Sequence, residues 1–322
     1  MRLSIFNSEH STGSTPVILR TAIMVLLASS IVLAGAVEVG TRSFIYRIST
    51  NLSRIHEESM VAAQVHGGER GHHQALLVGN SLLLQAVDIE ELARGLQPEW
   101  TIMRYAIEQT THYDWYYGIR GLLAQGSRPD IIVLCLEARH LIASSLRNEV
   151  FAYYLMQKRD LPSISRVLEL NAGDTFDLLL ANASIFYALR KDIRQIVLQR
   201  LIPELPQLTS MIAFSPTPPA DPSVLRVIGK ERLVAIRDLA ASSNVRLALL
   251  LMPPSKPDSA DALREIGREI SMPLLIPLEK EGLGISDYQE DGYHLNQYGR
   301  GKFTKSLVAL LQEMYGQEGI QQ

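Results

Sequence analysis

The sequence predicts an α/β fold: a three-layer αβα sandwich around a mainly parallel five-stranded sheet, with an N-terminal transmembrane helix. Beyond residue 73, short apolar runs alternate with longer amphipathic stretches, which is the pattern of βα units. The run Ile131 to Leu136 is apolar throughout and is preceded by Pro129-Asp130, as expected of a strand buried on both faces. Ahead of these units, Thr21 to Val37 carries no charged residue, which indicates a membrane segment.

Short apolar runs bounded by turn signals give the expected strands. They are Ala75 to Val78, Trp100 to Ala106, Ile131 to Leu136, Val245 to Met252 and a weaker Leu274 to Ile276. Amphipathic patterns predict helices over Leu82 to Leu96, Trp115 to Ala124 and Gly301 to Met314.

The chain is expected to divide into four parts. These are a cytoplasmic tail (1–15), a transmembrane anchor (16–39), a stalk or linker (40–72) and a globular domain (73–322). A stretch at about 141–222 has Leu, Ile, Tyr and Arg at helical spacing and exceeds the length of one crossover, so we expect a helical insertion there. Such an insertion either covers a site at the sheet edge or consists of packing helices alone.

The apolar N-terminal segment matches a hydrocarbon core of roughly 30 Å, and Arg20 can snorkel at one edge. A cleaved signal peptide is the alternative, because Ala34-Gly35-Ala36 offers small residues at cleavage spacing. Arginines flank the segment on both sides, so they do not settle its orientation. We expect an uncleaved single-pass anchor in the cytoplasmic membrane, with the bilayer as partner and the domain on the periplasmic or extracytoplasmic side.

Charge, cysteine and histidine usage argue against nucleic-acid binding, a reactive thiol and a metal site. The formal net charge of -3 gives no global field that would recruit nucleic acid, so nucleic acid is not an expected partner. The single cysteine, Cys135, lies in an apolar run and is expected to be a buried, inert thiol. His66, His72 and His73 lie in a glycine-rich stretch without a fixed ligand spacing, which favours a solvated linker over a metal site.

Ser81 is the first candidate functional residue. It follows Gly79 and Asn80 at the end of the first expected strand, immediately before a helix, where ligands bind in open α/β sheets. Its backbone N–H can stabilise an oxyanion formed on an acyl carbonyl. This motif alone is more typical of a serine that caps a helix.

Asp291 and His294 are the second candidate pair. They follow the last expected strand, and their three-residue spacing directs both side chains to one side of a turn. With Ser81 they give the chain order Ser, Asp, His that several α/β hydrolases use. In such a triad the histidine takes the serine proton and the aspartate orients the imidazole. An ordinary surface or capping role for His294 is the alternative.

Together the two motifs resemble blocks of the SGNH or GDSL-like hydrolases. GNSLLLQAVD resembles the first block, with Asn80 where the common version has Asp, and DGYHLNQYGR resembles the final Asp-x-x-His block. With the anchor and the insertion, the layout is similar to the branch of alginate-type O-acetyltransferases and D-alanyl transfer proteins. The resemblance implies ester chemistry outside the cytoplasmic membrane, without metal or organic cofactor.

Two other blocks depart from the family pattern. The second supplies a glycine, but Ile107 to His112 contains none. The third, usually Gly-x-Asn-Asp, is replaced by Glu137-Ala138-Arg139-His140. The oxyanion would therefore rely on the Ser81 N–H, with Thr110 or Arg139 as helpers. Arg139 can instead grip an anionic sugar or pair with Glu137.

Three functions are compatible with these features. The first is a serine-dependent acyltransferase or esterase that acts on O-acyl groups of a surface polysaccharide, with an acyl-donor or assembly membrane protein as partner. The second is a catalytically silent protein of this fold that binds polysaccharide or scaffolds an assembly machine. The third is a broad-specificity lipase, which predicts an open apolar pocket. The ordered Ser, Asp and His favour the first.

Overall fold

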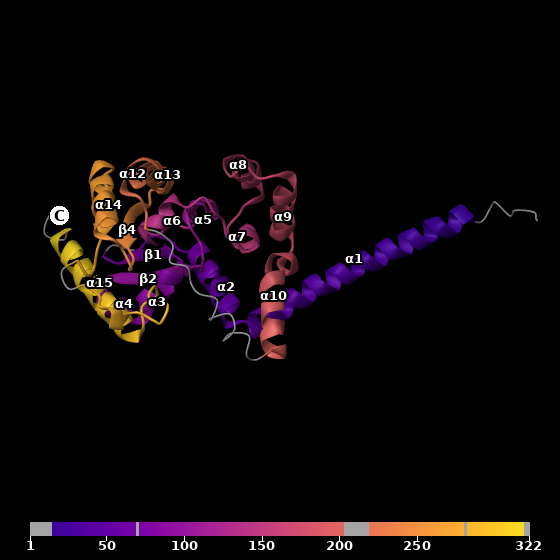
Figure 1. Cartoon of the computed structure of the whole chain (residues 1–322), viewed down its shortest axis with the longest axis horizontal. Helices are drawn as coiled ribbons and strands as arrows, with labels where there is room; N and C mark the ends of the chain where they lie inside the picture. The colour runs from indigo at the N-terminus through magenta and orange to yellow at the C-terminus, as the bar shows by residue number, and fades with distance from the viewer. Residues whose placement is uncertain (1–14, 69–70, 203–218, 280–281, 319–322) are drawn as a thin grey trace, which may run out of the picture.

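The fold is seen in a computed structural model that describes residues 15–68, 71–202, 219–279 and 282–318 (Figure 1). Its elements are, in chain order, α1 (Thr15–Ile48), α2 (Thr50–Ala63), β1 (His73–Gly79), α3 (Ser81–Ala86), α4 (Ile89–Leu96), β2 (Trp100–Ala106), α5 (His112–Ala124), β3 (Ile131–Leu136), α6 (Ala138–Ile142), α7 (Asn148–Tyr154), η1 (Lys158–Asp160), α8 (Leu161–Val167), α9 (Ala172–Ala183), α10 (Ile185–Leu201), α12 (Pro222–Val224), η2 (Leu225–Gly229), α13 (Lys230–Ala241), β4 (Arg246–Leu251), α14 (Pro257–Glu269), β5 (Leu274–Leu275), η3 (Ile285–Asp287) and α15 (Gln297–Glu318).

The sheet confirms the predicted fold class. It has five strands in the order β2-β1-β3-β4-β5, and all neighbouring pairs are parallel. The strands lie where the sequence predicted them, within about two residues at their ends. The helix expected over Leu82 to Leu96 is instead two helices, because the Asp88 side chain accepts from the N–H groups of Glu90 and Glu91 and caps a new helix, α4.

Helices cover both faces of the sheet, as the sandwich requires. One face presents Leu76, Val78, Ile132 and Leu134 to α2, α5, α13 and α14. The other presents Ala75, Leu77, Val133 and Cys135 to α3, α4 and α15. Because successive strand residues point to opposite faces, two apolar cores form from uninterrupted apolar runs. Cys135 is buried, as expected, and burial raises the pKa of its thiol.

Between β3 and β4 the chain forms the helical insertion, of which residues 203–218 lie outside the described part. Helices α7, α9 and α10 pack on one another, and Phe151, Ile185 and Leu189 are fully buried among them. The apolar spacing that predicted helices there therefore serves packing between the helices, with one side of α9 left exposed.

Helix α1 projects away from the globular part as one long rod (Figure 1). Over Val17 to Ile48 it is long and apolar enough to cross a membrane, and none of its most apolar stretch is buried. The helix begins at Thr15 and continues past the expected end of the anchor to Ile48. The expected cytoplasmic tail, 1–15, lies almost entirely outside the described residues.

Part of the segment expected as a stalk is packed against the domain. Helix α2 buries Leu52 and Ile55 in the core. The carboxylate of Glu58 accepts from the backbone N–H of Ala106 at 2.9 Å and from Arg104 at 2.8 Å. The expectation of a stalk or linker is therefore wrong for α2. The charges that suggested a solvated linker bind partners on β2, which is far away in the sequence.

Ile55→Ala tests whether α2 belongs to the folded domain. Ile55 has an exposed fraction of 0%, so its truncation should lower the free energy of unfolding by about 2–5 kcal/mol. Met60 lies on the same helix with an exposed fraction of 50%, and Met60→Ala should change stability by no more than about 0.5 kcal/mol. Urea unfolding in detergent measures both free energies. If Ile55→Ala changed stability as little as Met60→Ala, α2 would be a stalk that is not part of the folded domain.

Candidate active site

Ser81 lies at the carboxyl end of β1, as the first residue of α3. The preceding Asn80 caps this helix, since its Oδ1 accepts from the N–H of Leu82 at 3.1 Å. Gly79 permits the close approach of the end of β1 to β3: a Cβ there would lie 2.9 Å from the carbonyl oxygen of Cys135. The strand therefore delivers Ser81 to the sheet edge in a fixed orientation.

Asp291 and His294 lie in the loop between η3 and α15. The base of this loop is closed by Asn296, whose side-chain amide donates to the carbonyls of Ser286 and Tyr288 at 2.7 and 2.9 Å. Gly299 is needed there, because a Cβ would come within 2.2 Å of the Asp287 carbonyl oxygen. The tail of the second motif thus shapes the loop that carries the candidate residues.

The Asp291 carboxylate organises the tip of this loop. Its Oδ1 accepts from the backbone N–H groups of Tyr293 and His294 at 2.9 and 3.0 Å. Gly292, which follows Asp291, adopts the positive φ of 63° that this turn requires. Burial acts to raise the pKa of Asp291, but hydrogen bonds from the His294 ring and from these N–H groups outweigh it and hold the pKa below its usual value. The carboxylate is therefore ionised beside the imidazole.

The structure brings the three predicted residues together in one hydrogen-bonded chain. Asp291 Oδ2 lies 2.7 Å from His294 Nδ1, and His294 Nε2 lies 2.9 Å from Ser81 Oγ. An ionised carboxylate only accepts, so Nδ1 carries the proton and Nε2 is the acceptor for the Ser81 hydroxyl. This tautomer is the one that a general base at Ser81 needs.

A second polar chain beside it was not predicted from the sequence. The Tyr293 hydroxyl lies 3.2 Å from His140 Nε2, and His140 Nδ1 lies 3.4 Å from the side-chain amide nitrogen of Asn80. The Tyr293 ring packs edge-on against His294, with ring centres 5.0 Å apart. His140, which follows β3, therefore joins the Ser81 turn to the His294 loop. The only signal for His140 in the sequence was its position in the third block, which departs from the family pattern.

Asn80 fixes the protonation of His140. Its amide nitrogen donates to the Thr110 carbonyl at 3.0 Å, so its other N–H faces His140 Nδ1 and makes that nitrogen the acceptor. Burial, with the nearby Arg139 charge, lowers the pKa of His140 to about 4, so the ring is neutral at neutral pH. An aspartate at position 80 would offer no donor here, which gives a physical reason for asparagine.

The two expected oxyanion helpers have other contacts. The Thr110 hydroxyl is buried, donates to the Ile107 carbonyl at 2.7 Å and accepts from Trp115 Nε1 at 3.0 Å. Arg139 pairs with Glu137 at 2.7 Å and lies over the Tyr293 ring at 4.4 Å. The Arg139–Glu137 pair is the alternative that the sequence offered, and the Thr110 contacts shape the loop after β2. Assistance to the oxyanion by either residue stays a prediction.

The loop after β2 has an unusual backbone where the resemblance expects a glycine. Gln109 adopts a φ of 64°, in the left-handed region that favours glycine. The turn that a glycine would permit is thus formed by a residue with a side chain, and the Thr110 and Asn80 contacts hold it closed.

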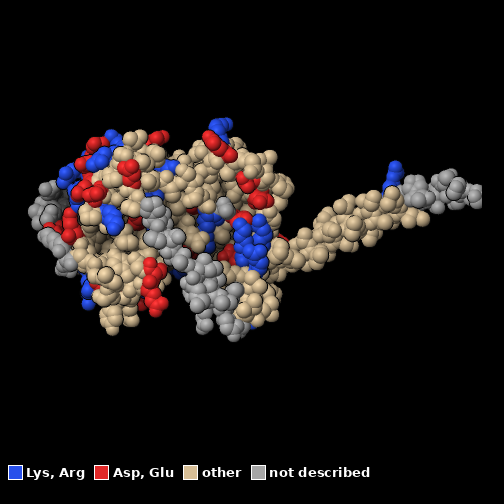
Figure 2. Space-filling view, viewed as in Figure 1, with Lys and Arg blue, Asp and Glu red and all other residues tan. Residues whose placement is uncertain are grey.

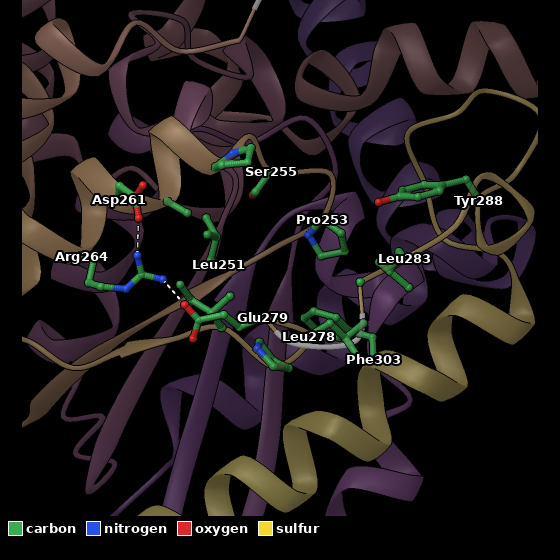
Figure 3. Close-up of a pocket in the computed structure, with 15 residues that line it drawn as sticks. Leu251, Pro253, Ser255, Asp261, Arg264, Leu278, Glu279, Leu283, Tyr288 and Phe303 are labelled. Atoms are coloured by element: carbon green, nitrogen blue, oxygen red, sulfur yellow. Dashed lines mark hydrogen bonds and ion pairs between the residues drawn. The ribbon is translucent and has the colours of Figure 1, made fainter.

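Two cavities lie away from Ser81. One of about 450 Å³ opens beyond the ends of β4 and β5, where Figure 3 shows Tyr288 on one side and Arg264 between Asp261 and Glu279 on the other. Another, of about 530 Å³, lies in the insertion and is lined by the charged side chains of Glu149, Asp174, Asp177 and Lys191. Within the described ranges, no three His, Cys, Asp or Glu side chains are placed to hold a metal ion.

Of the three predicted linker histidines, His66 is exposed as expected, whereas His72 and His73 have structural partners. His72 lies with one ring nitrogen 2.8 Å from the Pro98 carbonyl and the other 2.8 Å from the Thr101 hydroxyl. The ring of His73, the first residue of β1, lies 4.7 Å from that of Trp100. Both contacts tie the start of β1 to β2.

No protein-family model and no curated protein matches this sequence. Among solved structures, the chain is similar to the crystal structure of TesA at 13% identity, with a TM-score of 0.39, over 74% of this chain and 98% of that one. It is also similar to the psychrotrophic esterase EstA from Pseudoalteromonas sp. (10%, TM-score 0.40, 76% and 99%). A lipase, Lip_vut3 from a goat rumen metagenome, is a third (11%, 0.35, 74% and 97%). These similarities are distant and carry no functional argument.

The neutral His140 makes a testable contribution to stability. Its pKa in the folded chain, about 4, lies below the model-compound value of 6.5, so between these values the unfolded chain binds more protons. The stability that neutral His140 contributes should therefore fall as pH drops from about 6.5 to about 4, whereas Asp114, whose pKa burial raises to about 7, acts in the opposite direction. Across this range the unfolding midpoint of wild type should fall relative to that of His140→Gln, and buried His112 contributes to the pH dependence common to both. Ring NMR signals should show His140 unprotonated at pH 5.5, and a charged ring at that pH would contradict this account.

Proposed function

We propose that this chain is a membrane-anchored serine esterase or acyltransferase of the SGNH type, with Ser81 as nucleophile, His294 as general base and Asp291 as the group that orients it. The observation that carries the proposal is the continuous hydrogen-bonded chain from Asp291 through His294 to Ser81 at the carboxyl edge of a parallel sheet.

The reaction follows from the proton positions. Ser81 Oγ attacks the acyl carbonyl while His294 Nε2 takes the hydroxyl proton, and the carbonyl oxygen becomes an oxyanion beside the Ser81 backbone N–H. The C–O bond to the leaving alcohol then breaks, and His294 returns its proton to that alcohol. An acyl-Ser81 ester remains. Water or an acceptor hydroxyl then attacks the acyl carbon while His294 takes its proton. The bond from the acyl carbon to Ser81 Oγ breaks, His294 returns the proton to Oγ, and the acid or the acylated acceptor leaves.

The proposed substrates are O-acyl groups of a surface polysaccharide outside the cytoplasmic membrane. Helix α1, which has the length and composition of an anchor, supports the proposed location. The substrate class rests on the resemblance of the Ser81 and Asp291–His294 motifs to the polysaccharide-modifying branch of the SGNH hydrolases. An acyl-donor or assembly protein in the same membrane is the proposed partner.

One observation favours a second candidate, a catalytically silent polysaccharide-binding or scaffold protein. Thr110 and Arg139 make contacts elsewhere, so the Ser81 N–H is the one donor proposed here for the oxyanion. Loss of a single donor costs a serine protease about 10²–10³ in rate. The scaffold candidate predicts that Ser81 is not activated at all.

A fluorophosphonate probe separates these two candidates. Purified wild-type protein should be labelled, Ser81→Ala should not be labelled, and Asp291→Asn should be labelled much more slowly because the imidazole loses the tautomer that accepts the Ser81 proton. Ser286→Ala, on η3 just before the loop that carries His294, is the matched control and should be labelled like wild type. Labelling that is absent from the wild type, or unchanged in Ser81→Ala, would favour the scaffold.

Transfer and hydrolysis differ only in what attacks acyl-Ser81, so an acceptor decides between them. With an activated acetyl ester as donor, we expect an added oligosaccharide to become acetylated faster than free acetate forms. Ser81→Ala should abolish both products. An acetate yield that no acceptor alters, with Ser81 still essential, would identify an esterase.

A further inference from the structure

Glu38 joins the insertion to α1 at one defined position along that helix. It is the first charged residue after the uncharged run that begins at Thr21. Its carboxylate accepts from the Ser184 hydroxyl at 2.7 Å and from the backbone N–H groups of Ile185 and Phe186 at 3.1 and 3.3 Å. The corner between α9 and α10 is therefore bound to α1 where the uncharged run ends.

The position of Glu38 along α1 corresponds to the edge of a bilayer. From Arg20 to Glu38 the helix rises about 27 Å at 1.5 Å per residue, close to a hydrocarbon core of roughly 30 Å. A bilayer that covers this run ends near Glu38, so the α9–α10 corner lies in its interfacial region. In Figure 1, α9 and α10 stand on the side of the globular part from which α1 projects and run across its direction.

Helix α9 carries an exposed apolar face. Ala172, Phe176, Leu179 and Ala183 are all exposed, and their spacing of four, three and four residues places them on one face of the helix. Phe176 and Leu179 have exposed fractions of 57% and 40%, whereas Leu178 on the opposite face is buried in the core. An apolar face of this kind indicates a contact with another apolar phase.

Helix α10 combines exposed apolar and basic residues. Phe186, Val197 and Leu201 are exposed, and Arg194 and Arg200 lie among them. Figure 2 shows Lys and Arg atoms gathered over α10, beside the base of α1. Apolar residues interspersed with arginine and lysine are typical of helices that lie in a membrane interface.

We propose that the exposed faces of α9 and α10 lie on the bilayer that α1 crosses, with lipid as their partner. This inference rests on the membrane-spanning part of the proposed function and not on its catalytic part. Three attachments, α1, α9 and α10, prevent the globular part from tilting freely. They hold the edge that carries Ser81 in a fixed orientation to the membrane surface.

Spin labels on the full chain in phosphatidylcholine nanodiscs, with one copy per disc, test the proposal. Cysteines replace Phe176 and Leu179 on α9, exposed Leu27 within α1, and Val227, which has an exposed fraction of 69%, as an apolar control on η2. Native Cys135 is buried and should not react. Relative to the water-soluble reagent nickel-EDDA, oxygen should relax the labels on α9 and at Leu27→Cys severalfold more strongly than the label at Val227→Cys.

Each contrary outcome has a separate meaning. If the α9 labels behave like that at Val227→Cys while Leu27→Cys is in lipid, the docking surface is overturned and the anchor stands. If Leu27→Cys is itself in water, the anchor fails and the docking surface fails with it. Exclusion of both reagents at α9, or dipolar broadening between copies in discs loaded with two, would identify protein rather than lipid as the cover and overturn the proposal. None of these readouts depends on Ser81.

Discussion

The parallel alignment of the five strands is the constraint on which the candidate site depends. Because every strand runs the same way, the ends of β1, β2 and β3 and the loop after β5 all meet at one edge. The register of β1 against β3 places the turn after Gly79 beside Cys135, so the Asn80 side chain comes within reach of His140. No local preference of the Ser81 segment could bring these groups together.

The polar groups at this edge are held by few, mutually dependent contacts. Asn80 donates to Thr110 and to His140, His140 donates to Tyr293, and the Tyr293 backbone donates to Asp291. Buried polar groups are costly unless each has a partner, so loss of one member leaves the next unsatisfied. This dependence gives the His294 loop a defined position relative to Ser81 without the asparagine that the third block of the resembled family supplies.

The N-terminal part is joined to the domain by charges rather than by a flexible stalk. Arg54 on α2 donates to the Ala106 carbonyl at 2.6 Å and pairs at 2.7 Å with Glu108, in the loop that contains Thr110. At the other end, Glu38 on α1 binds the start of α10. The helix expected in the membrane is therefore continuous with structure that reaches both the insertion and the loop beside the candidate site.

By itself the sequence determined the fold class, the strands and the pairing of Ser81 with Asp291 and His294 as candidates, because periodicity, turn residues and a three-residue spacing are local properties. Only the tertiary structure decided the roles of residues whose partners are distant in sequence. His140 and Tyr293 are far apart along the chain, and no pattern around either shows that they meet. The charges of α2 were misassigned for the same reason, and the buried partner of Thr110 was not foreseen: a polar side chain does not reveal whether water or another residue of the folded chain satisfies it.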